Sequence, residues 1–599
     1  MKKLLIIVVA VVLLSSVLLI PNYAKGNNQQ NKISEELQMH IDQGEEEIPV
    51  YIWFEDLDLD AINAEAEKAL GYTQKDIQKV EDSIPSFNSN LNESDPEYDT
   101  ELLAYTEQTR IQRAEVLEMQ NYLIEKQREF ARVAYENYNA ENLQRIKLEA
   151  KQIVYVSRFT PVIIASVLSS DIVQLQENEA VLWLGYKQTS EPMELFSNAL
   201  PAVDAKYVRD TLGYDGYNVK VGMFDAGQIK STVTELSSTS ITKLDSSYAP
   251  LSAHATSVAM VLSGSNGFAP NVHLYSHSNT TTIEQGLEDL INCNVSVINM
   301  SVGYERPVIE NYYTDFEKWV DHIANSHNVS MVIPAGNDGM NLQIIQPGLS
   351  YNVNTVGGTN TKQTLSISDD VLFNESRTGN GGTSGCAKPD FLAPAFYNNI
   401  YNDSWQYMLN GGTSLAAPAV TGIIAQMIEC RPTIASKPAV IKAVLTSSTT
   451  RKLPLNSGGT STEAWADTIT AQQGAGEVNA KKAIAILSNN HYASGTMSST
   501  TITKTFPVTS SDQYIRYSVA WIRGNVANCS SQNATAGVAA NLKLRLFDTN
   551  NTALFTSNIP TSSVELAHIS INGVYGTYKA KIYRVDAGTN SFKYAVAWR

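Results

Sequence analysis

The spacing of apolar and polar residues divides the chain into four parts. Residues 1–24 hold a long, mostly apolar run, and residues 25–197 combine short strand-like runs with a long stretch of helical periodicity. Residues 198–490 alternate apolar strands with apolar helices, and residues 491–599 contain runs in which every second residue is apolar. A chain of 599 residues with this variation is expected to form several domains.

The first part has the composition of a signal peptide. Lys2 and Lys3 precede the apolar run from Leu4 to Ile20, and Ala24 offers a small residue for cleavage. A retained membrane anchor is the alternative, because the run approaches the length that spans a bilayer. The small residue favours cleavage, so we predict a signal peptide over residues 1–24 and a secreted protein without membrane attachment.

Residues 25–197 are predicted to form an α+β unit with a helical insert. Strand-like runs occur at Ile48–Phe54, Ser157–Ala165 and Ala180–Leu184. Between them, residues 91–151 are rich in Glu, Gln, Arg, Leu and Ala, with apolar residues at helical spacing. This pattern indicates a long helix or a helical hairpin. A solvated amphipathic insert is the simpler interpretation, and a docking surface is the alternative.

The third and fourth parts predict different fold classes. Alternating strands and helices over residues 198–490 indicate a doubly wound α/β domain with a parallel sheet. The strict alternation in Tyr514–Ile522 and Leu542–Phe547 indicates an all-β sandwich or jelly roll over residues 491–599.

Four polar residues of the third part lie where a predicted strand ends or a helix begins. Asp225 and Asn337 follow apolar strands, whereas His254 and Ser414 open apolar helices, the latter with Pro418 in its first predicted turn. Each has a simple interpretation as a turn or cap residue. Together they bring a carboxylate, an amide, an imidazole and a hydroxyl to the edge where open α/β sheets bind ligands.

Around these residues the sequence resembles the subtilisin-like serine peptidases, the subtilases. The matching motifs are Gly412-Thr413-Ser414-Leu415-Ala416-Ala417-Pro418, Ala335-Gly336-Asn337 and Asn299-Met300-Ser301-Val302-Gly303. The order Asp…His…Ser is also that of subtilisin. The resemblance covers about residues 198–490 and rests on a specific combination of motifs.

The resemblance implies a serine endopeptidase with Asp225, His254 and Ser414 as its catalytic triad. It also implies that Asn337 stabilises the oxyanion. Ser301-Val302-Gly303 and Pro334-Ala335-Gly336 would bind an extended protein or peptide substrate.

The resemblance further implies a zymogen that processes itself. Residues 25–197 would be a prodomain that acts as an intramolecular inhibitor.

The family motifs are not matched in full, because Ala226 and Ala255 replace the usual hydroxyl and glycine after the aspartate and the histidine. We interpret them as variants of a working site, since no reacting group is missing. A catalytically inactive binding protein of the same fold is the alternative. An α/β-hydrolase is disfavoured, because Ser414 lacks the Gly-x-Ser-x-Gly context and follows the other two residues.

Charge and metal-binding residues narrow the range of partners. The formal net charge of −17 argues against a nucleic-acid partner. The histidines show no metal-ligand spacing, so we predict no metal site and no cofactor for the chemistry. A structural calcium ion is compatible with the family, although no ligand set is identifiable. Four cysteines allow three pairings, and free thiols are an equal alternative (Cys293, Cys386, Cys430 and Cys529).

Overall fold

The computed structural model describes most of the chain from Lys32 onward. The described residues are 32–599 without 45, 88–96, 188–199, 246–248, 279–281, 306–312, 340–341, 363–369, 380–386, 402–404, 406, 451–452, 454–468, 511, 524–540, 560–561, 572 and 586–590. The predicted signal peptide lies outside these residues, as do Cys386 and Cys529. Cys293 and Cys430 are free thiols.

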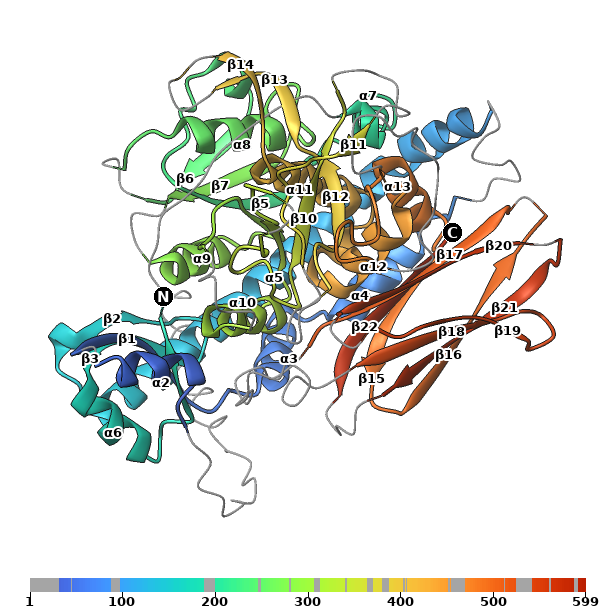
Figure 1. The fold of residues 1–599 in the computed structure, drawn as a ribbon. Coiled ribbons are helices and arrows are strands. Elements are labelled where there is room, and N and C mark those ends of the chain that lie inside the picture. The colour runs from blue at the N-terminus through green and yellow to red at the C-terminus, as the bar shows by residue number, and fades with distance from the viewer. Residues whose placement is uncertain are drawn as a thin grey trace.

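A mostly parallel sheet forms the centre of the molecule, in the order β11-β10-β9-β8-β5-β7-β6 with β12 beside β10 (Figure 1). All pairs are parallel except β10 with β11. The strands are β5 (Lys220–Asp225), β6 (Ser240–Lys243), β7 (His273–Ser278), β8 (Val297–Met300), β9 (Ser330–Pro334), β10 (Asn354–Asn360), β11 (Val371–Leu372) and β12 (Phe391–Pro394). The prediction of an α/β domain with a parallel sheet is therefore confirmed.

Helices cover both faces of this sheet because its strands are apolar on both sides. Val221 and Met223 of β5 pack into one core, whereas Phe224 packs into the other. The first core contains α8 (Ala253–Ser263), α11 (Thr413–Cys430), α12 (Pro438–Ser448), α13 (Ala480–Ser488) and the short α7 (Ala205–Asp210), and the second contains α9 (Ile283–Asn292) and α10 (Asp315–Ser326). A hairpin of β13 (Phe396–Tyr401) and β14 (Tyr407–Gly411) leads into α11.

Among the described helices, α11 has the length and hydropathy of a membrane span, but 94% of that window is buried inside the protein. It is therefore the central core helix of this domain.

The N-terminal region forms an antiparallel sheet of order β2-β3-β1-β4. Its strands are β1 (Glu47–Trp53), β2 (Ile153–Val156), β3 (Val162–Leu168) and β4 (Trp183–Tyr186), and its shorter helices are α2 (Glu35–Asp42), α3 (Leu59–Leu70), α4 (Gln74–Asp82) and α6 (Ser169–Glu177). Tyr51, Trp53 and Phe159 of this region share the core that contains Phe316 and Trp319 of α10. The sheet therefore packs on α9 and α10.

The predicted insert is one helix of 49 residues, α5 (Tyr98–Ile146), and not a hairpin. In Figure 1 it runs diagonally behind the parallel sheet. Leu102, Leu117 and Ile124 are buried in the same core as α11. The interpretation as a solvated insert is therefore wrong, because α5 buries an apolar face against the domain that follows it.

A buried arginine of α5 joins the ends of two helices. Arg128 is 4% exposed, and its guanidinium donates to Val295 O (2.7 Å), to Ile291 O (3.4 Å) and to His327 O (3.3 Å). The carbonyl groups of Ile291 and His327 lie at the carboxyl ends of α9 and α10, where the helix dipoles are negative, and that of Val295 lies between α9 and β8. The charge of Arg128 is therefore stabilised by peptide dipoles.

The C-terminal part consists of two four-stranded antiparallel sheets around one core, in the orders β15-β22-β17-β20 and β16-β21-β18-β19. The strands are β15 (Tyr492–Met497), β16 (Thr501–Val508), β17 (Tyr514–Trp521), β18 (Leu542–Phe547), β19 (Ala553–Ser557), β20 (Val564–Ser570), β21 (Gly576–Arg584) and β22 (Phe592–Trp598). The first sheet packs on α12, where Ser447 donates to Ala597 O (2.9 Å) and Ser518 donates to Ala443 O (2.8 Å).

Arg128→Ala is expected to lower the free energy of unfolding by about 2–4 kcal/mol, because three buried carbonyl groups lose their donor and a cavity remains. Denaturant unfolding measures the change. Arg132→Ala is the matched control, since Arg132 lies one turn along α5, is one-third exposed and pairs with Glu136. It should cost less than about 1 kcal/mol. Equal losses would show that Arg128 contributes no more than a surface ion pair.

Candidate active site

Asp225 and His254 meet at the carboxyl edge of the parallel sheet. Asp225 is the last residue of β5, and Ser252 caps α8 so that His254 lies in its first turn. His254 Nδ1 lies 2.6 Å from Asp225 Oδ1, and both side chains are buried. An ionised carboxylate only accepts hydrogen bonds, so Nδ1 carries the proton. In the neutral tautomer that this bond selects, Nε2 is the acceptor.

Two further observations describe the surroundings of this pair. The N–H of Ala226 donates to Asp225 Oδ1 (2.7 Å), so the backbone holds the carboxylate although Ala226 has no hydroxyl. His254 Nε2 makes no hydrogen bond to any described residue, Ser414 included. An unoccupied Nε2 is available to a proton donor, and catalytic hydrogen bonds often tighten only when substrate is bound.

Ser414 is the second residue of α11, after the cap residue Gly412. A helix supplies no acceptor for the N–H groups of its first turn, so the Ser414 N–H is available at the positive end of the helix dipole. Pro418 lies in the second turn and not in the first as predicted. A proline there cannot donate to the carbonyl of Ser414, four residues earlier.

Ser301 replaces the missing donor of Pro418. Its Oγ donates to Ser414 O (2.6 Å) and accepts from Asn299 Nδ2 (2.8 Å). Ser301 follows β8, which neighbours β5 in the sheet. A residue implied by the resemblance to bind substrate therefore also supports the backbone of Ser414.

The side chain of Asn337 is fixed by the start of α11. Its Oδ1 accepts from the N–H of Thr413 (2.9 Å) and from Thr413 Oγ1 (3.1 Å), while Thr413 Oγ1 accepts from the N–H of Gly336 (3.1 Å). Because Oδ1 is engaged, the amide nitrogen Nδ2 remains as the available donor. This orientation suits a group that stabilises negative charge beside Ser414.

Asn337 and Ser414 line one small cavity of about 20 Å³. Five of the six residues implied to bind substrate also line this cavity, namely Ser301, Val302, Gly303, Pro334 and Gly336. Glu305 and Ile345 complete its lining. Ala335 does not line it. Its side chain is buried with Ile344 and Leu349.

Thr413 and Arg377 support this site, although neither had a role assigned from the sequence. The buried Arg377 side chain donates through Nε to Asn337 O and pairs with Glu305 (2.7 Å). The position of Thr413 next to Ser414 could have indicated its role from the sequence. No sequence pattern indicates the role of Arg377, because its contacts join segments that are distant in the sequence.

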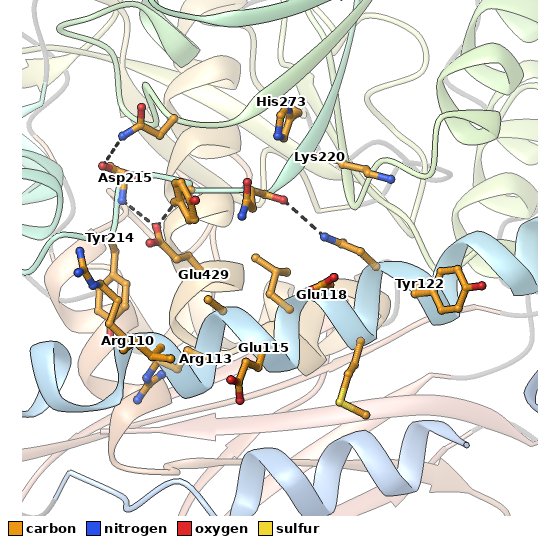
Figure 2. A pocket seen from close by; sticks show the side chains of 18 of the residues that line it. Arg110, Arg113, Glu115, Glu118, Tyr122, Tyr214, Asp215, Lys220, His273 and Glu429 are labelled. Carbon is orange, nitrogen blue, oxygen red and sulfur yellow. Dashed lines mark hydrogen bonds between the residues drawn. The ribbon is translucent and has the colours of Figure 1, made fainter. Parts of the chain in front are cut away.

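A larger groove lies elsewhere, between α5 and residues 213–220, with a volume of about 1290 Å³ (Figure 2). On one wall, Glu429 Oε2 accepts from the N–H groups of Asp215 and Gly216 (2.8 Å each). Burial raises the pKa of Glu429 to about 8. None of Asp225, His254 and Ser414 lines the groove. Within the described residues, no three His, Cys, Asp or Glu side chains are placed to share a metal ion.

The part of the sequence that contains this site is similar to known proteins. Residues 197–476 match the sequence model of the subtilase family. Serine protease AprX of Bacillus subtilis is 28% identical over 205 residues, which cover 32% of this chain and 43% of that protein. Subtilisin DY of Bacillus licheniformis is 29% identical over 254 residues, which cover 40% of this chain and 86% of that protein. The match thus spans less than half the length of AprX.

A solved structure is similar at a lower level. The epidermin leader peptide processing serine protease EpiP of Staphylococcus aureus is 18% identical, with a TM-score of 0.41, and the match covers 58% of this chain and 96% of that one. The sequence matches alone support the assignment. This chain therefore carries a serine peptidase domain of the subtilase family, over residues 197–476.

Proposed function

We propose that the protein is a secreted endopeptidase that hydrolyses peptide bonds through an acyl-enzyme intermediate. The observation that carries this proposal is the bond of 2.6 Å between His254 Nδ1 and Asp225 Oδ1, which leaves Nε2 as a base. Export rests on the signal-like residues 1–24.

In the proposed reaction Ser414 Oγ attacks the carbonyl carbon of the scissile bond while His254 Nε2 takes its proton. His254 then delivers this proton to the leaving amine, and water hydrolyses the acyl-enzyme by the same steps. Asp225 orients the imidazole and stabilises its charged form. Asn337 Nδ2 and the Ser414 N–H hold the oxyanion. This chemistry needs no cofactor.

The substrates in this proposal are extended proteins or peptides. An extended chain beside Ser301–Gly303 and Pro334–Gly336 would pair with these segments as an added strand. The cavity next to Ser414 holds only about 20 Å³, and the apolar side chain of Ile345 is part of its lining. We therefore expect small side chains to be preferred before the cleaved bond.

The N-terminal region would act as an intramolecular inhibitor. Its docking on α9 is polar as well as apolar, because Glu288 accepts from Tyr155 Oη (2.5 Å), Ser157 Oγ (2.5 Å) and the N–H of Arg158 (2.9 Å). Lys187, the last described residue before the junction, pairs with Glu284 of α9 (2.8 Å). The junction itself, residues 188–199, lies outside the described residues.

Labelling with a fluorophosphonate probe tests the proposal, because only an activated serine reacts. The unmodified chain should be labelled, and Ser414→Ala should not. A chain that binds peptides but resists the probe would instead be the catalytically inactive binding protein.

Asn337→Ala is expected to lower kcat with little change in KM, since the donor acts only once the oxyanion forms. The scale known for the oxyanion asparagine of subtilisin is about 10²–10³-fold. Hydrolysis of a chromogenic peptide measures both constants. Asn299→Ala, which removes a buried amide behind Ser301, serves as the comparison and should change kcat less. An Asn337→Ala enzyme with full kcat would remove Asn337 from the mechanism.

Self-processing predicts that the unmodified chain yields a product whose first residue falls within residues 186–198. A tethered junction meets Ser414 at high effective concentration. The Ser414→Ala chain should accumulate as a precursor that lacks only its signal peptide. N-terminal sequencing of the two chains, each purified without other proteases, measures where they are cleaved. Equal cleavage of the two would attribute processing to another enzyme.

Docking of the N-terminal region should also depend on pH through Glu288. Burial raises the pKa of Glu288 from its ordinary value of 4.5 to about 7. The folded chain then binds more protons than the unfolded chain between these values. The corresponding stability is fully present below about pH 4.5 and is lost as the pH rises through 7.

Urea unfolding of the Ser414→Ala chain at pH 5 and pH 8 measures this effect. Adding Glu288→Gln, which keeps an acceptor without the titration, should shrink the pH difference by up to about 3 kcal/mol. The raised pKa of His277, next to Asp289, acts in the same direction and stays in both chains. An unchanged pH difference would rule out Glu288 as its source.

A further inference from the structure

The C-terminal domain differs in charge from the rest of the chain. Residues 491–599 contain ten Lys and Arg against four Asp and Glu, whereas the whole chain contains 44 against 61. A basic domain attached to an acidic protein indicates an anionic partner for that domain.

Strand register gathers four of these cations on one face. Lys543 pairs with Tyr583, Arg545 with Lys581, and Phe547 with Lys579. Paired residues of antiparallel strands point to the same side of a sheet. Their sequence neighbours Leu544, Leu546, Ala580 and Ile582 are buried in the sandwich core, so the cations point outward. We call Lys543, Arg545, Lys579 and Lys581 the basic face.

The domain itself does little to neutralise this face. None of β16, β18, β19 and β21 contains Asp or Glu. Arg545 and Lys581 lie directly opposite each other, an arrangement of like charges that costs stability. Arg545 Nε is buried and has no hydrogen-bond partner among the described residues. Both cations lie over the ring of Phe547, at 5.3 and 4.9 Å from its centre, a contact that carries no counter-charge.

Protection of a sheet edge does not explain these cations. Lysines commonly shield edge strands from pairing with other chains. In this sheet the edges are β16 and β19, and the basic face lies on the two inner strands, β21 and β18. The other sheet of the sandwich packs on α12, so the basic face points away from the peptidase domain (Figure 1).

We propose that the basic face binds an extended acidic polysaccharide and so holds the peptidase on a surface that carries such a polymer. Neighbouring strands are about 4.8 Å apart and alternate residues about 6.8 Å apart, a spacing on the scale of successive sugar units. Hydroxyl groups flank the cations in register, since Thr503 and Thr505 pair with Lys581 and Lys579, and Thr556 pairs with Arg545. They supply donors and acceptors for sugar hydroxyls.

Single-stranded nucleic acid fits this face less well. Such polymers bind where bases stack on open aromatic rings. Here Arg545 and Lys581 lie over the ring of Phe547 and occupy it. A polymer without flat bases is therefore favoured.

Binding of the full-length Ser414→Ala chain to immobilised heparin and to polygalacturonate tests the proposal, and it does not depend on peptidase activity. The test variant is Arg545→Gln/Lys581→Gln. The control is Lys68→Gln/Lys79→Gln, which removes the same formal charge from side chains that are 70% and 76% exposed in the N-terminal region.

We expect the Ser414→Ala chain to bind at 0.15 M salt. The test variant should lose at least about tenfold in affinity and show a weaker salt dependence, and the affinity of the control should not change. The melting temperature of the test variant should stay the same or rise, because two opposed like charges are removed. Failure to bind either polymer, or equal losses in both variants, would overturn the proposal. So would tighter binding to poly(dT), which favours nucleic acid, or binding to anionic phospholipid vesicles alone, which favours a membrane.

Discussion

The first turn of α11 depends on hydrogen bonds from two neighbouring strand ends. Ser301, after β8, donates to the carbonyl of Ser414, and Asn337, after β9, accepts from the N–H of Thr413. Pro418 makes the first bond necessary, because it removes the donor that a regular helix would supply. Parallel strands end at the same edge, so these contacts also set the position of α11 relative to Asp225 and His254.

The N-terminal region holds two helices of the peptidase domain at both of their ends. At the amino ends, Tyr51 and Lys187 contact Glu284 of α9, and the N–H of Tyr186 donates to Asp315 of α10 (2.9 Å). At the carboxyl ends, Arg128 of α5 donates to carbonyl groups of both helices. At the carboxyl ends, the positive charge of Arg128 complements the negative ends of the two helix dipoles. At the amino ends, the contacts are made to Glu284 and Asp315, acidic first-turn residues that themselves complement the positive ends.

A buried lysine links the peptidase domain to the C-terminal sheets. Lys442 of α12 donates to Tyr351 O (3.0 Å) and to Ser563 Oγ (3.1 Å) and pairs with Asp390 (3.2 Å). Burial lowers its pKa to about 8, although Asp390 opposes that shift. The sheet β15-β22-β17-β20 is thus attached to the peptidase domain through specific polar contacts. The basic face of the other sheet stays available to a partner.

Periodicity and motifs in the sequence determined the parallel α/β domain and the positions of Asp225, His254, Asn337 and Ser414. Both are local properties, because alternation and strand-end residues are visible within a few positions. Only the tertiary structure showed that Pro418 lies in the second turn of α11, that α5 is buried along one face, and that Arg377 supports Asn337. Each depends on partners far away in the sequence, and residue spacing carries no information about which distant surfaces meet.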